Sequence, residues 1–403
     1  MEQRTHPYGR ATLAIGAVFL VNGMTFSSWF ARLPELRERL DVSDGALGLT
    51  LVGGGIGGLA VSIVSGAVVD RVGSRAATVA TSLGLSTLLP LVGLASAAPL
   101  LFATLILLGA LDGMTDVAMN AQAVQLHRDS GRSTMSRFHA LWSAGAVIGG
   151  LIGSRAAAAD VSLRLQLAMT AAVLVVITLG AARCLLPPAP RSQGAEHGLP
   201  ARAPGHRPLL VRLFAVGAAV ALTEMPPNDW STLLMTDRFD VSDGTAGLGF
   251  VAVAAGMLVG RLLGDAVIAR VGLERARRAG GLLALAGTVI ATSVPTVIAT
   301  SCGFFVAGLG IAVLFPVMFR TSGELIGGST TGMAAFSSGA RFGFLVAPPL
   351  VGLIAELTSI ATAVLLVSGV AAVAVAASSL PTTADRPTVR PASPVSGQRC
   401  DTP

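Results

Sequence analysis

The sequence contains no lysine, so all 28 of its basic residues are arginine. A nucleotide-binding loop that ends in Gly-Lys-Ser/Thr is therefore excluded, and so is a mechanism that forms a Schiff base on lysine. The three cysteines, Cys184, Cys302 and Cys400, show neither metal-ligand spacing nor an evident pairing. No concentrated catalytic set stands out elsewhere. We expect no cofactor, no metal and no enzymatic activity.

Charge is also scarce, because only 12% of the 403 residues are charged whereas 52% are hydrophobic. Soluble globular proteins carry about 25% charged residues. Apolar runs of about 20 residues recur along the chain, which is the length that an α-helix needs to cross a bilayer. Strand-like alternation is absent, which argues against a transmembrane barrel. The composition indicates an all-α membrane protein that contacts the lipid bilayer.

The apolar runs predict twelve membrane-spanning helices. The first run, Ala11–Phe30, is long for a signal peptide and lacks a clear small-x-small cleavage site, so we interpret it as a retained helix. The predicted spans are residues 11–31, 45–68, 76–96, 99–124, 136–158, 163–186, 209–235, 245–268, 278–298, 300–322, 331–356 and 359–380.

The arginines are distributed unevenly between the two sides of these spans. Only six of the 28 fall on the side opposite the termini, namely Arg32, Arg37, Arg39, Arg155, Arg164 and Arg238. Because positive residues stay on the cytoplasmic side, both termini are predicted to be cytoplasmic. We expect a multi-pass protein of a bacterial cytoplasmic (inner) membrane. The same sidedness explains the net charge of +6 without a nucleic-acid partner.

A polar segment divides the chain near its middle. It reads PPAPRSQGAEHGLPARAPGHRP, is rich in proline, glycine and arginine, and predicts a flexible linker. The tail is rich in proline, threonine and serine and is predicted to be disordered. The predicted division is a first six-helix half (1–186), a cytoplasmic linker (187–208), a second six-helix half (209–380) and a cytoplasmic tail (381–403).

The two halves share short sequences at a fixed offset. DVSDG occurs at Asp41–Gly45 and 199 residues later at Asp240–Gly244, and RVG recurs at the same offset at Arg71–Gly73 and Arg270–Gly272. Gly153 and Gly352 also match. Two matches at one offset indicate a duplicated unit. A tandem pair of six-helix units is typical of transporters that bind their solute between the halves, near the middle of the membrane.

Glycines recur every four residues in two of the spans, as Gly145, Gly149 and Gly153 and as Gly256, Gly260 and Gly264. Small residues at this spacing permit close helix crossings. We interpret them as packing residues rather than binding residues.

The loop after the second span, GAVVDRVGSR, resembles the G-x-x-x-D-R-x-G-R signature of the major facilitator superfamily. Ser74 stands where the signature usually has its first closing arginine, and a looser copy, GRLLGDAVIARVGLER, follows in the second half. The resemblance implies twelve helices in two pseudo-symmetric halves and a role for these residues in gating the cytoplasmic side. The gating residues are Gly66, Asp70, Arg71, Gly73, Arg75, Gly260, Arg261, Asp265 and Arg270.

Further segments resemble the YbjJ-like, fucose-permease-related bacterial branch of that superfamily. They are FARLPELRERLDVSDGALG, DVAMN, RFHALWSAGAVIGG and TEMPPNDWS. The resemblance places Asp116 and Asn120 where the fucose permease has a glutamate and an asparagine. It places His139 on a glutamine and Trp142 on an asparagine. A first-span aspartate of that permease has no clear counterpart, and Asn22 is the nearest polar residue.

Few polar or charged side chains lie at membrane depth, and such groups are candidates for a transport pathway. The candidates are Asn22, Asp112, Asp116, Asn120, His139, Trp142, Glu224 and Arg341. Burial disfavours a charged carboxylate, so Asp112, Asp116 or Glu224 could carry a proton. Met225-Pro226-Pro227 is predicted to break the seventh span beside Glu224, because proline removes a helix hydrogen bond. Arg341 stays charged and suits an anionic or polar solute, or a counter-ion role.

Structural alternatives remain for several of these residues. Asp112 lies between Gly109 and Gly113 and could join two helices, His139 could be a hydrogen-bonding residue near the membrane edge, and Arg341 could merely pair with a carboxylate. Trp142 could stack on a sugar or an apolar ring, whereas Trp29 and Trp230 resemble interfacial belt residues.

We expect a monomeric secondary transporter that moves a small polar solute by alternating access, coupled to protons at Asp116 and Glu224. A drug or metabolite exporter of the same superfamily is the first alternative. A membrane enzyme is disfavoured because no catalytic cluster is evident. A sensor that does not transport would need an output domain, which neither terminus is long enough to supply.

Overall fold

A computed structural model describes residues 8–131, 135–187, 207–325 and 330–378, and all regular elements in these ranges are helical. The predicted linker lies outside the described residues except at its two ends, and the predicted tail lies wholly outside them. The first half contains α1 (Gly9–Phe30), α2 (Leu33–Leu40), α3 (Asp44–Ser62), α4 (Ser65–Val72), α5 (Ser74–Leu88), α6 (Pro90–Leu94), α7 (Ala98–Ser130), α8 (Met135–Ala158) and α9 (Leu163–Ala182).

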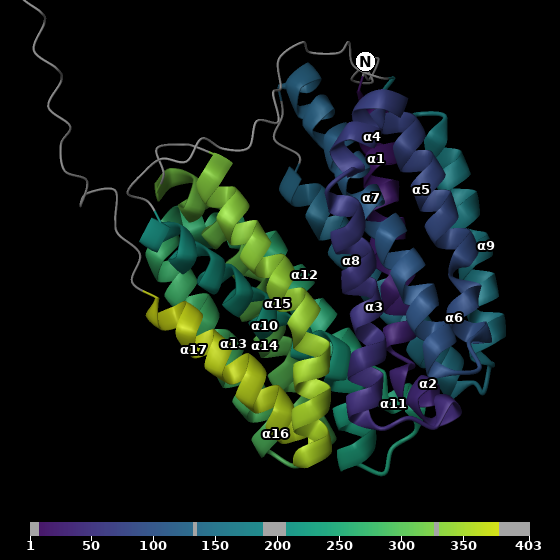
Figure 1. The fold of residues 1–403 in the computed structure, drawn as a ribbon, viewed down its shortest axis with the longest axis vertical. Helices are drawn as coiled ribbons and strands as arrows, with labels where there is room; N and C mark the ends of the chain where they lie inside the picture. The colour runs from purple at the N-terminus through teal and green to yellow at the C-terminus, as the bar shows by residue number, and fades with distance from the viewer. Residues whose placement is uncertain (1–7, 132–134, 188–206, 326–329, 379–403) are drawn as a thin grey trace, which may run out of the picture.

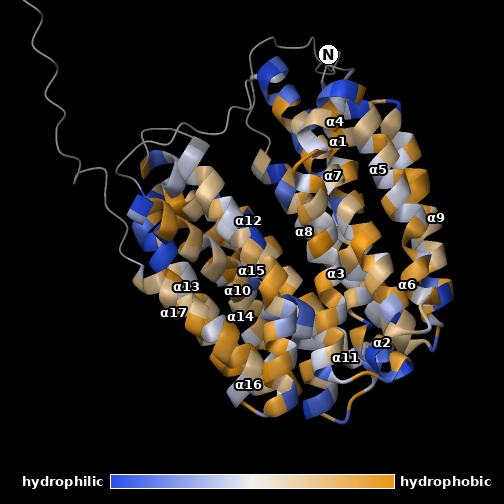
Figure 2. Cartoon of the chain, viewed as in Figure 1, coloured by the Kyte–Doolittle hydropathy of each residue, from blue (hydrophilic) through white to orange (hydrophobic). Residues whose placement is uncertain are grey.

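The second half contains α10 (Arg207–Arg238), α11 (Asp243–Ala246), α12 (Leu248–Val271), α13 (Leu273–Ser293), α14 (Val297–Leu325), α15 (Thr330–Leu357), α16 (Ile360–Val364), the π-helix η1 (Leu365–Gly369) and α17 (Val370–Ala377). Within the described residues, ten segments are long and apolar enough to span a membrane. The helices α8 and α13, of 24 and 21 residues, complete the twelve. Figure 2 shows hydrophobic residues along the helices and hydrophilic ones gathered towards their ends.

The two halves lie side by side (Figure 1). They adjoin at the end of the molecule that carries α2, α11 and α16, and they diverge towards the end that carries α4 and the N-terminus. We call these the α2 end and the α4 end. Helix α15 packs on α3, and α12 packs on α8, across the boundary between the halves.

The repeated sequences form repeated local structures. Ser43 and Ser242 each cap the helix that follows, because their side chains accept a hydrogen bond from a backbone N–H three residues on. Gly73 and Gly272 both adopt a positive φ, +87° and +83°, at the turns after α4 and α12. Only glycine adopts such angles without strain. The internal repeat is therefore present in the fold as well as in the sequence.

The glycines spaced by four residues lie where helices cross closely. A Cβ atom on Gly145 or Gly149 would come within 2.2 or 2.7 Å of backbone oxygens of α1. In the second half, a Cβ atom on Gly256 would lie 2.1 Å from the carbonyl oxygen of Phe305 on α14. The predicted packing role is confirmed at these three glycines.

Helix α10 corrects one prediction, because it continues through Pro226 and Pro227 without a break. Proline at position 227 leaves the carbonyl of Thr223 without its helical partner. The Ser368 hydroxyl, on η1, donates a hydrogen bond of 2.8 Å to that carbonyl. A side chain of a neighbouring helix thus supplies the hydrogen bond that this carbonyl lacks, which is how membrane helices tolerate proline.

Candidate functional site

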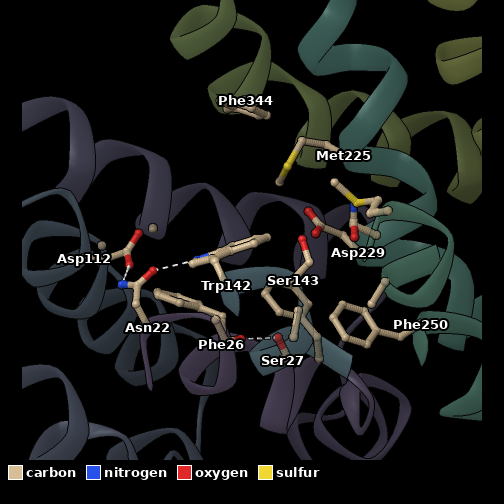
Figure 3. A pocket seen from close by; sticks show the side chains of 18 of the residues that line it. Asn22, Phe26, Ser27, Asp112, Trp142, Ser143, Met225, Asp229, Phe250 and Phe344 are labelled. Atoms are coloured by element: carbon tan, nitrogen blue, oxygen red, sulfur yellow. Dashed lines mark hydrogen bonds between the residues drawn. The ribbon is translucent and has the colours of Figure 1, made fainter. Parts of the chain in front are cut away.

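A cavity of about 450 Å³ lies between the two halves (Figure 3). Its wall is formed by α1, α3, α7 and α8 of the first half and by α10, α12 and α15 of the second. Five of the eight predicted pathway residues line it, namely Asn22, Asp112, Asp116, His139 and Trp142. Much of the remaining wall is apolar, with Phe26, Phe250 and Phe344 among its side chains. The wall therefore combines a hydrophobic surface with a few charged groups.

A chain of hydrogen bonds orders one side of the cavity. The indole N–H of Trp142 donates to Oδ1 of Asn22 at 2.7 Å, and Nδ2 of Asn22 donates to Oδ1 of Asp112 at 2.7 Å. Because the indole can only donate, the amide oxygen of Asn22 must face it, which directs the amide nitrogen to Asp112. Asn22 thus joins α1, α7 and α8, and Asp112 is both an interhelical contact and a cavity residue.

Asp116 lies one turn further along α7, with its side chain exposed to the cavity. Nδ2 of Asn120 donates to Oδ1 of Asp116 and to its backbone carbonyl, both at 2.9 Å. Asn120 therefore orients Asp116 from outside the cavity wall. The charge of Arg341 on α15 acts on Asp116 from the other half, but the two form no ion pair within 4.0 Å.

Arg261 crosses from the second half to the first. Its Nη1 donates to the hydroxyl of Ser143 at 2.5 Å, and its guanidinium carbon lies 4.9 Å from the centroid of the Trp142 ring. The ring face attracts a cation at this distance. The motif resemblance grouped Arg261 with the gating residues. The structure places it in the cavity wall, more than two turns before the loop, where α12 packs on α8.

The other predicted residues lie around this arrangement. His139 lines the cavity and packs edge-on to Phe19, with ring centroids 5.5 Å apart. Among the described residues, the cavity wall includes neither Glu224 nor Arg341. The carboxylate of Glu224 instead acts on the guanidinium of Arg261 and on Asp229.

Asp229 is a cavity residue that sequence reasoning missed. It lies on α10, lines the cavity, and has only 4% of its surface exposed. The segment TEMPPNDWS had drawn attention to Glu224 and the two prolines. Asp229 lies five residues beyond Glu224, about 140° further around the continuous helix α10, and it lines the cavity whereas Glu224 does not. The signal in the sequence that could have pointed to Asp229 is an acidic residue within an apolar span.

The loop motif at the α4 end is hydrogen-bonded within its own half in this conformation. Nε of Arg75 donates to the backbone carbonyl of Ala182 on α9 at 3.1 Å. Asp70 and Arg71 are exposed. In the second half, Asp265 and Arg270 are exposed as well, and Gly260 packs against Ala312 of α14. Within the described residues, no hydrogen bond joins these loop residues to the opposite half.

At the α2 end the halves are joined directly by an ion-pair cluster. The short helix α2, not predicted from the sequence, buries Leu33, Leu36 and Leu40 and presents Arg37 on its other face. Arg37 pairs with Asp237 of the second half at 2.5 Å and with Asp44 at 2.7 Å. Although burial opposes the charged form, the hydrogen bonds and charges of the two carboxylates raise the pKa of Arg37 above its ordinary value.

Both copies of DVSDG also touch the opposite half at this end. The N–H of Gly45 donates to Oε2 of Glu356 at 3.1 Å, and the hydroxyl of Ser154 donates to the carbonyl of Gly244 at 2.5 Å. Each contact lies at the first turn of a helix that begins with the motif. The α2 end is therefore closed by contacts from both halves.

Sequence comparison identifies relatives along nearly the whole chain. The family model of the Major Facilitator Superfamily matches residues 14–234 and 227–399. An uncharacterized MFS-type transporter of Yersinia pestis is 28% identical over 367 residues, covering 90% of this chain and 93% of that protein. The membrane protein MosC of Rhizobium meliloti is 28% identical over 382 residues, covering 93% and 91%.

Solved structures share the fold at low sequence identity. The nucleoside transporter NupG matches with a TM-score of 0.68 and 14% identity, covering 90% of this chain and 96% of that one. FucP, a Major Facilitator Superfamily transporter in the outward conformation, matches with a TM-score of 0.62 and 16% identity, covering 90% and 96%. With the family model spanning both halves and this fold around a central cavity, the chain belongs to the Major Facilitator Superfamily and is a multi-pass membrane transporter.

Proposed function

We propose that this protein couples the movement of a small polar solute to protons by alternating access, with the solute bound in the cavity between the halves. Asp116 is the proton-carrying residue, and Asp112 and Asn22 form the adjoining polar wall. The proposal includes a bacterial inner-membrane location, a cytoplasmic linker at residues 187–208 and cytoplasmic termini. The α4 end then faces the cytoplasm.

The observation that carries the proposal is the pair Asp112 and Asp116 on one face of α7. Both line the cavity, and each receives one amide hydrogen bond, from Asn22 and Asn120. Carboxylates at membrane depth are costly when charged and unpaired, and they often belong to proton relays. Two neighbouring carboxylates also repel each other when both are ionised, so binding one proton relieves both costs.

The contacts between the halves support a cycle in which they rock about the cavity. In this conformation the contacts of Arg37, Gly45 and Ser154 close the α2 end. We infer that they separate when the solute is exchanged at the outer side. The loop residues Asp70, Arg71, Arg75, Asp265 and Arg270 then meet the opposite half and close the cytoplasmic side. Arg341, facing Asp116 from α15, is the residue through which the protonation state of Asp116 would be sensed in the second half.

The test is solute uptake by purified protein in proteoliposomes under an imposed pH gradient, with a panel of sugars, nucleosides, amines and carboxylates. We expect uptake of at least one solute to depend on the gradient. Replacing Asp116 by asparagine should abolish the dependence, whereas Asp129→Asn, at an exposed position near the end of the same helix, should retain it. Absence of flux for every solute in both gradient directions would contradict the proposal.

The apolar part of the wall favours a second candidate, an exporter of amphipathic compounds. Phe26, Phe30, Phe250 and Phe344 line the cavity together with Met119, Met225 and Met257. Aromatic and methionine side chains adapt to apolar ligands of varied shape. Expression in a drug-sensitive host separates the two candidates. An exporter raises resistance to several unrelated apolar compounds, whereas a solute importer does not.

A further inference from the structure

Asp229 is the cavity carboxylate for which the structure offers no hydrogen-bonding partner. Its side chain is 96% buried, since only 4% of its surface is exposed, and Figure 3 shows its carboxylate directed into the pocket. Within the described residues it accepts no side-chain hydrogen bond and forms no ion pair. An ionised carboxylate in so buried a position is destabilised without a compensating donor or cation.

The other charged groups around the cavity already have partners. Asp112 accepts from Asn22, and Asp116 accepts from Asn120 and faces the charge of Arg341. Arg261 donates to Ser143, lies over Trp142 and faces Glu224. The charge that acts on Asp229 is that of Glu224, which has the same sign. Within the described residues, no arginine or histidine forms an ion pair with Asp229.

The surroundings of Asp229 suit a small cation with an apolar portion. Phe250 and Phe344 line the same cavity, and the faces of such rings attract ammonium and guanidinium groups. The cavity volume of about 450 Å³ lies in the usual range for small-molecule sites. Asp112 lies on the opposite wall, so a second polar group of the solute could be held across the cavity. An anionic solute would instead meet three carboxylates and one engaged arginine.

We propose that the cavity takes a small organic cation, whose ammonium or guanidinium group is bound by the carboxylate of Asp229. This proposal rests on the proposed function, because it names the class of solute for the same cavity. It makes Asp229 the residue that determines specificity, separate from the proton-carrying role given to Asp116. A neutral or anionic analogue of the same size lacks the charge that Asp229 requires.

The experiment measures ligand binding by the purified full-length protein in detergent, in potassium buffer at pH 7. Two matched sets of probes are used: glucosamine, glucose and glucuronate, and phenethylamine, 2-phenylethanol and phenylacetate. We expect the ammonium member of at least one set to bind about tenfold or more tightly than the neutral member, as charge-assisted hydrogen bonds allow. Asp229→Asn should remove this preference, and the exposed control Asp129→Asn should keep it.

Four results would overturn the proposal. In the first, no ammonium probe binds more tightly than its neutral analogue. In the second, Asp229→Asn retains the preference. In the third, Asp229→Asn changes only the pH dependence of flux, which would make Asp229 a proton site. Proton-driven flux of a neutral solute would overturn the cation proposal and leave the proposed function standing. Ammonium binding without flux in liposomes would leave the cation proposal standing and would overturn the proposed function.

Discussion

The first copy of DVSDG meets a carboxylate of the opposite half, whereas the second copy meets a hydroxyl. Gly45 donates its N–H to Glu356, and the carbonyl of Gly244 accepts from Ser154. The capping serines and helix starts are alike in the two copies. The residue 199 positions before Glu356 is Ala157, so the repeat did not preserve the charged partner. The duplication thus retains backbone geometry while the contacting side chains differ.

The same contrast holds inside the cavity. The first half supplies Asp112 and Asp116, each with an amide partner, and the second half supplies Asp229 and Arg261. Arg261 then reaches back to Ser143 in the first half. The two halves thus share a scaffold and divide the chemistry. We assign proton carriage to the first half and solute recognition to the second.

The largest expected effect comes from adding a methyl group to the glycines of the two DVSDG copies. A Cβ atom on Gly244 would lie 2.5 Å from Cβ of Ala158 and 2.9 Å from its backbone, which cannot move away easily. On Gly45 it would clash with the end of the flexible Glu356 side chain, which can move aside. Overpacking costs about 1–3 kcal/mol. We expect Gly244→Ala to disfavour the closed α2 end by that amount and Gly45→Ala by less.

Spin labels at Glu38→Cys and Thr358→Cys, on a background without the native cysteines, would report this change. Both positions are exposed at the α2 end, one on each half. The distance distribution should shift towards longer distances in Gly244→Ala. Equal shifts in the two glycine variants would contradict the difference between the copies. Gly180→Ala, at a glycine with no atom within 4 Å of the added group, is the control.

A smaller effect is expected at the prolines of α10, the first helix of the second half. The first helix of the first half, α1, contains no proline. Ser368→Ala removes the donor to the carbonyl of Thr223 beside Pro227. Side-chain hydrogen bonds between membrane helices contribute about 1 kcal/mol. We expect a lower thermal midpoint in detergent for Ser368→Ala. Ser322→Ala should change it less, since Ser322 bonds only to Phe319 of its own helix.

Much of this scaffold could be predicted from the sequence, because it depends on local signals. The spans follow from apolar runs, and the turns at Gly73 and Gly272 follow from the repeated RVG. Asp112 and Asp116 were expected on one face because they lie four residues apart. The course of α10 could not be predicted, since it depends on a hydroxyl of Ser368, 145 positions away.

The positions of Arg261 and Asp229 in the cavity wall could not be predicted from the sequence either. A motif resemblance grouped Arg261 with the gating residues, although it lies within the predicted span 245–268, nine residues before Arg270 and therefore more than two helical turns away. Its contact with Ser143 depends on how α12 packs against the other half. Asp229 was not singled out in the sequence, and its place in the cavity wall depends on how the helices of the two halves pack.

The charged partner of the first DVSDG copy should contribute more than the hydroxyl partner of the second. Glu356→Gln removes a negative charge at the start of α3, where it interacts favourably with the helix dipole by about 0.3–1 kcal/mol. Ser154→Ala removes one neutral hydrogen bond. The same spin-label pair should show a larger opening for Glu356→Gln. A larger opening for Ser154→Ala than for Glu356→Gln would contradict this prediction.

The smallest effect is expected at Arg37. Its bond to Asp237 is partly exposed, with 22% and 37% of the two side chains accessible, and such pairs contribute at most about 1 kcal/mol. Arg37→Gln should open the α2 end slightly, and added salt should reduce the difference from wild type. Because the pKa of Arg37 is raised further above neutrality, its charge and its contribution persist as pH rises from 7 to 9. Weakening of the contact over that range would contradict this assignment.

The most direct test of the account is solute-driven proton movement in proteoliposomes, measured with the solute that the uptake panel identifies. Wild type and Asp129→Asn should take up protons together with the solute. Asp116→Asn should exchange solute across the membrane without moving protons, because it cannot be protonated. Proton uptake by Asp116→Asn at the wild-type ratio to solute would contradict the central claim that this carboxylate, in the first half, carries the proton.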